Sequence, residues 1–283
     1  MTVRDISHVE LYTRDKVATV RFLVSTMNFT QVADSVAVDR SSVLLRQGDV
    51  QIVVTSGWAT GKWLSEHGDG VADIAMTCDD VSETAQAALA AGAKVTHSPQ
   101  GNPVVSGWGG VSLTLLSDVT AGSAVPPAGH TWTAALGAPA EPVGRILRLD
   151  HIAFRLEASG LADYAAFCTE VFGLSPLPVT RLVPGHQDAT SVVVRSASER
   201  VAFVLDAANA HHSAGALPAS ADSERPMDVH RLALLADGVR SETHEFQDPA
   251  MRGLCFQLVE RSGPHQLSTV DAGLAAGIWS SVG

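Results

Sequence analysis

The sequence predicts an α+β fold of two similar domains, each built from units with the order β-α-β-β-β. Two observations support this prediction. The chain has 283 residues, which exceeds the roughly 100–200 residues of an ordinary domain and favours two of them. A strand pattern that carries a histidine opens each half, and His8 and His151 stand 143 positions apart in similar surroundings. Repetition at such an offset indicates a duplicated unit of structure.

In the first half, apolar and polar residues alternate in short runs, which is typical of strands with one buried face. A run with helical spacing follows the first strand and ends at Asn28. Three more strand patterns come after this helix. The expected elements are a strand at 6–12, a helix at 15–27, and strands at 29–38, 41–47 and 50–55.

The second half repeats this order from its opening strand. Its helical run is closed by Gly173, and glycine commonly ends helices because it accepts the left-handed conformation. The expected elements are a strand at 149–155, a helix at 161–172, and strands at 178–183, 190–196 and 201–205.

Each half also contains a second unit, and the one in the second half looks abbreviated. Only about twenty residues separate its two evident strands, and Asp-Gly, Asp-Pro and Arg-Gly breaks among them argue against a helix. The expected elements are a strand at 71–77, a helix at 81–92 and strands at 103–106 and 111–116 in the first half, and strands at 228–235 and 254–260 in the second.

A segment rich in Ala, Gly and Pro separates the halves. Residues 119–144 show no sustained period, which is typical of a surface connection. We therefore expect domains at 1–118 and 145–283, joined by a linker at 119–144.

Composition limits the classes of function. Apolar residues make up 46% of the chain and charged residues 17%, so a sizeable core is expected. The net charge of −11 and the absence of basic runs argue against a nucleic-acid partner. Three widely spaced cysteines encode neither a disulfide framework nor a zinc knuckle. No secretory signal or membrane-spanning stretch is evident, so a cytoplasmic protein without a membrane partner is expected.

Several stretches together resemble the vicinal oxygen chelate superfamily, and within it the family of 4-hydroxyphenylpyruvate dioxygenase and 4-hydroxymandelate synthase. The resemblance implies that the paired units form cupped mixed sheets around a metal. It covers most of the chain, and the most specific single run is HGDGVADIAM. The stretches that carry it are HVELYTRD, LRQGDVQIVVT, HGDGVADIAMTCDDV, LDHIAFRL, SVVVRSAS and FQLVERSG.

The resemblance implies a metal site in the C-terminal domain. Members of this family hold non-haem Fe(II) through two histidines and a glutamate, which leave the opposite side of the ion open for substrate and O2. The two histidines match His151 and His230, and the glutamate position holds Gln257. We therefore expect a divalent metal on these three residues, with Fe(II) as the first candidate and Zn, Co, Ni or Mn as alternatives.

Each of these residues has a simpler structural interpretation. A histidine in an apolar strand is usually a core residue, but two at matching strand positions favour a metal pair. Gln257 is neutral and binds a hard cation less well than a carboxylate does. Glu260 cannot replace it, because it lies three residues along the strand and faces the other way. An alternative alignment makes Phe256-Gln257-Leu258 a remnant of another strand and leaves no third ligand; we favour the first, because Val259-Glu260-Arg261 follows in the family's order.

Further residues are assigned by the same resemblance. Ser191, His186 and Gln187 match the segment that lines the substrate cup. In the first half, we place His8, Asp73 and Thr114 at the positions of His151, His230 and Gln257, and interpret them as a vestige without metal. The family's clamp for 2-oxo acids is absent, although a closing helix remains at 268–279.

Three functions remain open. The first is a metal-dependent oxygenase or oxidase that acts on a small, aromatic or amino-acid-derived molecule together with O2. The second is a non-oxidative isomerase, lyase or epimerase that uses a divalent metal as a Lewis acid, which suits a glutamine ligand better. The third is a degenerate, metal-free binding protein. We favour the first because the nearest resemblance is to dioxygenases; a homodimer is an open alternative to a monomer.

Overall fold

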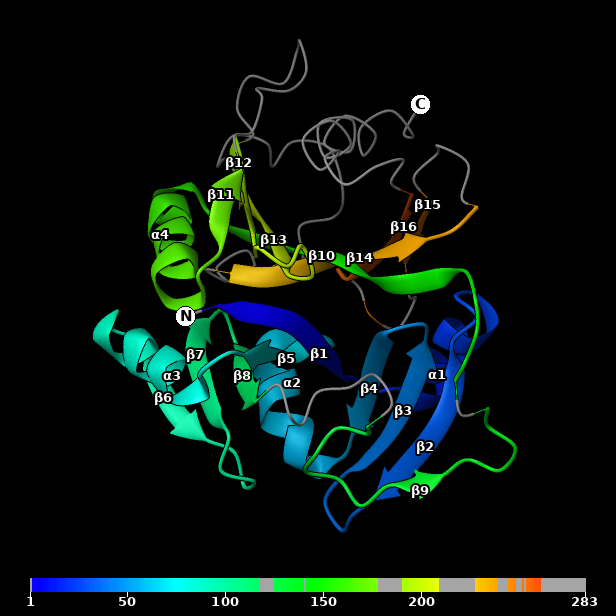
Figure 1. Cartoon of the computed structure of the whole chain (residues 1–283). Helices are drawn as coiled ribbons and strands as arrows, with labels where there is room; N and C mark the ends of the chain where they lie inside the picture. Colours follow the sequence, from blue (N-terminus) through cyan, green and yellow to red (C-terminus); the bar gives the residue numbers. More distant parts are fainter. Residues whose placement is uncertain are drawn as a thin grey trace.

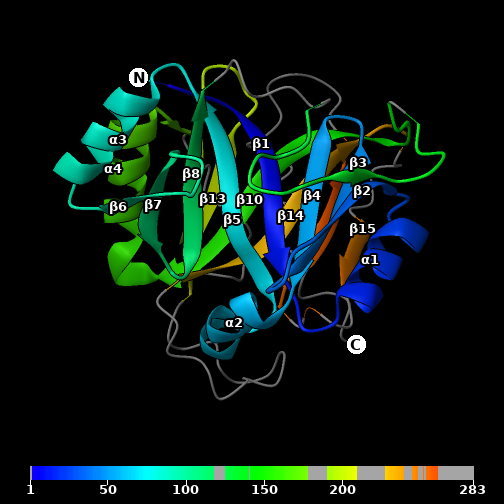
Figure 2. The ribbon, with the colours of Figure 1, turned by 90° about the horizontal axis from the view of Figure 1, so that it is seen from below.

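Two β-sheets stacked one above the other form the body of the protein (Figure 1). The computed structural model describes residues 2–117, 125–139, 141–177, 190–208, 227–238, 244–247, 251 and 253–260. The helices flank the stack, with α3 and α4 together on one side and α1 on the other (Figure 2). The α+β fold with two mixed sheets is confirmed.

The N-terminal sheet has nine strands, with β1 at its centre. Strand β1 pairs in parallel with β4 and antiparallel with β5, so the two β-α-β-β-β units of this half meet there. In order across the sheet the strands are β6 (Lys94–His97), β7 (Pro103–Trp108), β8 (Val111–Ser117), β5 (Gly70–Cys78), β1 (Val3–Tyr12), β4 (Val50–Ser56), β3 (Ser41–Gln47), β2 (Thr30–Val36) and β9 (Thr133–Ala134).

The C-terminal sheet repeats this arrangement with seven strands around β10. Strand β10 pairs in parallel with β13 and antiparallel with β14, as β1 does with β4 and β5. The opening strands expected at 6–12 and 149–155 therefore hold equivalent places. The strands are β11 (Ser175–Leu177), β12 (Thr190–Arg195), β13 (Ala202–Ala208), β10 (Ile146–Glu157), β14 (Met227–Ala236), β16 (Cys255–Val259) and β15 (His244–Gln247).

The three longer helices lie where the sequence predicts them. Asp15 and Asp80 cap two of them, because their carboxylates accept hydrogen bonds from the first-turn amides of Ala18 and Glu83. Gly173 ends the third in the left-handed conformation, as its position indicated. None of the described helices is long and apolar enough to cross a membrane. The helices are α1 (Lys16–Ser25), α2 (Gly61–His67), α3 (Val81–Ala90) and α4 (Leu161–Phe172).

The second unit of the C-terminal half is abbreviated as expected. Strand β15 occupies the place of β7, since both pair antiparallel with the last strand of their half. Where the N-terminal half has α3 and β6, the described residues between β14 and β16 contain only this strand. The strand expected at 178–183 and the closing helix expected at 268–279 lie outside the described residues. Within the predicted linker, β9 adds to the N-terminal sheet beside β2.

The sheets share one hydrophobic core. Alternate residues of β10 and β14, among them Ile152, Phe154 and Leu232, face the N-terminal sheet and belong to the same buried cluster as its Ile74. Trp108 is the largest residue of this cluster, and its ring lies 5.2 Å from that of Phe154. The opposite face of each sheet, called here its outer face, points away from this core.

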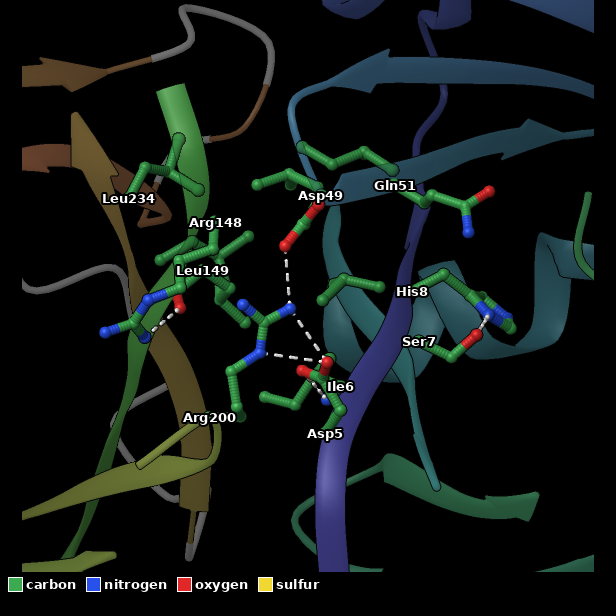
Figure 3. A pocket seen from close by; sticks show the side chains of 14 residues that line it. Asp5, Ile6, Ser7, His8, Asp49, Gln51, Arg148, Leu149, Arg200 and Leu234 are labelled. Atoms are coloured by element: carbon green, nitrogen blue, oxygen red, sulfur yellow. Dashed lines mark hydrogen bonds and ion pairs between the residues drawn. The ribbon is translucent and has the colours of Figure 1, made fainter. Parts of the chain in front are cut away.

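Polar contacts also join the halves (Figure 3). The guanidinium of Arg200, from the second half, donates to Asp5 at 2.8 Å and to Asp49 at 2.8 Å, both in the first half. Gln47 accepts a hydrogen bond from the amide of Ile146 at 2.7 Å. These contacts cross between the two sheets and add polar links to their shared apolar core.

Trp108→Ala is expected to lower the free energy of unfolding by about 3–5 kcal/mol, because it leaves a large cavity between the sheets. Trp58→Ala is the matched control, since Trp58 is 73% exposed whereas Trp108 is 2% exposed. The control should change stability by less than about 0.5 kcal/mol. Urea unfolding followed by circular dichroism measures both, and equal effects would contradict the shared core.

Candidate functional site

His151 and Gln257 lie in one row across the outer face of the C-terminal sheet. His151 pairs with Ala233 on β14, and Ala233 pairs with Gln257 on β16. The neighbours of Ala233 on its strand, Leu232 and Leu234, face the shared core, so alternation places this row on the outer face. Alanine between the two polar residues leaves room for their side chains to approach.

The His151 ring is held by a carboxylate and has one unused nitrogen. The side chain is 1% exposed, and its Nδ1 lies 2.8 Å from Oδ2 of Asp150. Its Nε2 is buried and has no hydrogen-bond partner among the residues that the structure describes. A histidine with a carboxylate on one nitrogen and a free lone pair on the other is the usual arrangement of a metal ligand.

Gln257 is also buried without a partner. It is fully buried, and within the described part of the chain neither Oε1 nor Nε2 of its amide makes a hydrogen bond. A buried amide without partners costs free energy, and such groups in proteins usually meet a ligand, an ion or water. Two unsatisfied polar side chains in one row therefore indicate a site for a bound group.

His230 lies close to this row but is paired differently. A register shift between Ala153 and Phe154 leaves it as the extra residue of a bulge on β14. Its Nε2 is 3.0 Å from Oδ2 of Asp206, on β13. The other oxygen of Asp206 accepts a hydrogen bond from the hydroxyl of Ser191 at 2.6 Å. The structure thus links two of the predicted residues through a carboxylate that the sequence did not single out.

The charges of this pair follow from its surroundings. Burial by itself would raise the pKa of Asp206, but His230, Ser191 and Arg231 lower it below its ordinary value. Burial lowers the pKa of His230, although Asp206 opposes that change. At neutral pH, Asp206 is therefore ionised and His230 neutral, so Nε2–H donates to the carboxylate and Nδ1 carries the lone pair.

The donor set fits a divalent metal in part. His151 Nε2 and Gln257 Oε1 are unsatisfied donors of the kinds such ions bind. His230 also has a carboxylate on one nitrogen, which leaves the other for coordination. In the part of the chain that the structure describes, no three His, Cys, Asp or Glu side chains lie close enough to hold an ion. A divalent ion held by His151 and His230 would therefore take a third protein ligand of another kind, and among the described residues Gln257 Oε1 is the candidate in this row.

The structure places only some of the predicted residues. His186 and Gln187 lie outside the described residues. Sequence analysis missed Asp150, Asp206 and Arg231. The signal that could have found them is a charged side chain within an otherwise apolar strand, because such residues are rarely buried without a polar function.

The N-terminal sheet carries the matching row, and one predicted equivalence is wrong. His8 pairs with Ala75, and Ala75 with Thr114, as His151, Ala233 and Gln257 do. Asp73, however, pairs with Glu10 on β1, and the equivalent pair in the C-terminal sheet is Arg231 with Ala153 on β10. Asp73 therefore corresponds to Arg231 and not to His230. Strands β5 and β14 each contain a bulge at the same place. The extra residue of the bulge is Ala72 in β5 and His230 in β14, so Ala72 is the equivalent of His230.

This N-terminal row lies among buried ionisable groups. The labelled side chains of His8 and Gln51 point away from Arg200, across strand β1 (Figure 3). Burial and the nearby Glu10 raise the pKa of Asp73 to about 7, although Thr114 donates to it at 2.8 Å. Burial and His130 lower the pKa of His8 to about 4. At neutral pH this face therefore contains a neutral histidine.

Comparison with known proteins agrees with the architecture. Residues 7–108 match the model of the Glyoxalase/Bleomycin resistance protein/Dioxygenase superfamily. A mutant of 4-hydroxymandelate synthase from Streptomyces coelicolor has a similar structure, with a TM-score of 0.79 and 26% sequence identity over 98% of each chain.

A second solved structure is similar in fold. It is a fusion of a xylose isomerase-like TIM barrel with 4-hydroxyphenylpyruvate dioxygenase, with a TM-score of 0.70 and 16% identity. The match covers 97% of this chain and 52% of the fusion protein, so the chain spans about half the length of that relative. The predicted resemblance to this superfamily is therefore confirmed.

Asp73→Asn is expected to stabilise the protein at pH 8 and to change little at pH 4. The native state holds the Asp73 proton up to a pKa of about 7, whereas the unfolded state releases it near its ordinary value of 3.8. Stability therefore falls as pH rises between these values, and the amide removes that loss. Each unit of pKa shift corresponds to about 1.4 kcal/mol.

Urea unfolding of both proteins across this range measures the difference. Asp237→Asn is the control, because Asp237 is exposed. A stability difference that does not depend on pH would show that Asp73 is ionised in the native protein.

Proposed function

We propose that this chain is a metal-dependent oxygenase or oxidase related to 4-hydroxyphenylpyruvate dioxygenase and 4-hydroxymandelate synthase. It acts on a small organic molecule at the outer face of its C-terminal sheet. The observation that carries the proposal is the His151 ring, fixed by Asp150 and left with an unsatisfied Nε2 in one row with the unsatisfied amide of Gln257. The similarity to 4-hydroxymandelate synthase over the whole chain supports the class of reaction.

His151, His230 and Gln257 would hold the metal. Fe(II) is the first candidate, and Zn, Co, Ni or Mn are the alternatives. When bound, the ion would supply Lewis acidity and, if it is iron, the redox chemistry that O2 requires. Imidazole and amide ligands add no negative charge, so the charge of the ion would be balanced by an anionic group of the substrate or by hydroxide.

The protein's own contribution is orientation and exclusion of water. Asp150 and Asp206 each hold one nitrogen of a histidine ring, which fixes the direction of its other nitrogen. Ser191 is held through Asp206 and would present its hydroxyl to the substrate. A small apolar cluster of Ala153, Val193 and Val204 forms the adjoining wall of the outer face and would cover the apolar part of the substrate.

A second candidate is a non-oxidative isomerase, lyase or epimerase of the same superfamily. Gln257 favours it, because a neutral amide in place of a carboxylate leaves an ion more electrophilic and suits stabilisation of an enolate. Oxygen consumption separates the two functions. Turnover of a substrate without uptake of O2 would replace the first candidate with the second.

Metal affinity tests the site directly. His151→Ala should weaken binding of Fe(II) or Co(II) by more than the roughly 10–100-fold that loss of an outer partner causes. Gln257→Glu should tighten it by about tenfold or more, equivalent to about 1.4 kcal/mol, because an anionic oxygen replaces a neutral one. Titration under anaerobic conditions, with elemental analysis of the product, measures both.

His8→Ala is the matched control, since His8 holds the same place in the N-terminal row. It should leave metal affinity unchanged. If the wild-type protein binds no divalent ion, or if loss of His8 matters as much as loss of His151, the proposed site is wrong.

A further inference from the structure

We propose that Arg231 is the anion-binding residue of this site and that the substrate is an apolar carboxylic acid. This rests on the proposed function in one respect, which is that the substrate occupies the outer face of the C-terminal sheet. Three features of Arg231 support this role: its position in the sheet, its lack of partners among the described residues and the charge of the groups around it.

Register places Arg231 next to the proposed ligands. It pairs with Ala153 on β10 and with Cys255 on β16, two residues along β14 from Ala233. It therefore shares the outer face with His151 and Gln257 and lies one pair of residues away from their row.

Arg231 is buried but has no polar partner among the described residues. The residue is 7% exposed, and its Nε is buried without an acceptor. No described residue forms an ion pair or hydrogen bond with its guanidinium. Burying a guanidinium costs desolvation free energy unless a hydrogen-bond acceptor pairs with it. Arg200 shows the usual arrangement in this protein, with Asp5 and Asp49 both accepting its hydrogen bonds.

The nearest carboxylate does not fill this role. Asp206 already accepts hydrogen bonds from His230 at 3.0 Å and from Ser191 at 2.6 Å, so its oxygens point toward those groups. Its attraction to Arg231 acts through space. The planar fork of the guanidinium, which suits a carboxylate, is therefore left for a ligand.

Charge balance favours an anion as that ligand. Imidazole and amide groups bind a metal in their neutral forms, so a divalent ion on His151, His230 and Gln257 would bring two positive charges that no protein ligand compensates. Asp206 and Arg231 cancel each other. A carboxylate from the substrate would reduce this excess, whereas a neutral or cationic molecule would not.

The wall beside Arg231 defines the rest of the substrate. Its strand partner Ala153 belongs to the apolar cluster with Val193 and Val204. An anionic group on the guanidinium would thus place the remaining part of the molecule against apolar side chains. This arrangement suits a carboxylic acid with an apolar body.

The test compares phenylacetate with its uncharged analogue phenylacetamide by calorimetric titration of the metal-free protein. The wild type should bind the carboxylate at least about tenfold more tightly than the amide. Arg231→Met should bring that ratio close to one. Arg231→Lys, which keeps the charge but loses the fork, should give an intermediate ratio.

Arg155→Met is the matched control. Arg155 comes from the adjacent strand, but its side chain is 51% exposed and lies 4.0 Å from Asp228. Its removal should leave the ratio unchanged. Circular dichroism and the melting temperature establish that each variant is folded, and the lysine variant keeps the test valid if the methionine variant does not fold.

The outcome is independent of metal chemistry. If the wild type does not prefer the carboxylate, or if loss of Arg231 leaves the preference intact, the inference is overturned even where the protein binds metal. If the preference depends on Arg231 but no divalent ion binds, the anion site holds and the proposed oxygenase function fails.

Discussion

The central part of strand β10, residues 149–154, is buried on both of its faces, and the rest of the structure depends on this constraint. Ile152 and Phe154 on its inner face complete the core that the two sheets share, where the Trp108 ring lies 5.2 Å from that of Phe154. Its outer face carries His151, which is 1% exposed and whose Nε2 has no partner. Because the core fixes the inner residues, alternation fixes the direction of the outer ones. Stability and the candidate site are thus set by the same strand.

The two halves show how one arrangement can carry different chemistry. The same row across three strands holds His8, Ala75 and Thr114 in one sheet and His151, Ala233 and Gln257 in the other. In the N-terminal half, the hydroxyl of Thr114 donates a hydrogen bond to Asp73, so the polar group at this position has its partner within the sheet. In the C-terminal half the glutamine amide has no such partner. The difference between the rows is therefore one of unsatisfied groups and not of fold.

Sequence patterns predicted the fold better than they predicted the site. Alternation and helix-ending residues such as Gly173 depend on local physics, and the strands and helices that they indicated within the described residues are present. The row of His151 and Gln257 followed from a resemblance and from alternation. The bulge that makes His230 an extra residue could not be predicted, because it depends on the pairing of β10 with β14. The matching bulge in β5 makes Asp73 the equivalent of Arg231. The contact between Asp206 and His230 could not be predicted either, because it joins two strands that are separated by β10.

The most direct test of the central claim is a crystal structure of the protein grown with Co(II), with diffraction measured on both sides of the cobalt absorption edge. We expect one anomalous peak on the outer face of the C-terminal sheet, in contact with His151 Nε2 and Gln257 Oε1, about 2.0–2.2 Å from the imidazole nitrogen. A peak beside His8 in the N-terminal sheet, or well-ordered crystals with His151 and Gln257 bound only to water, would contradict the account.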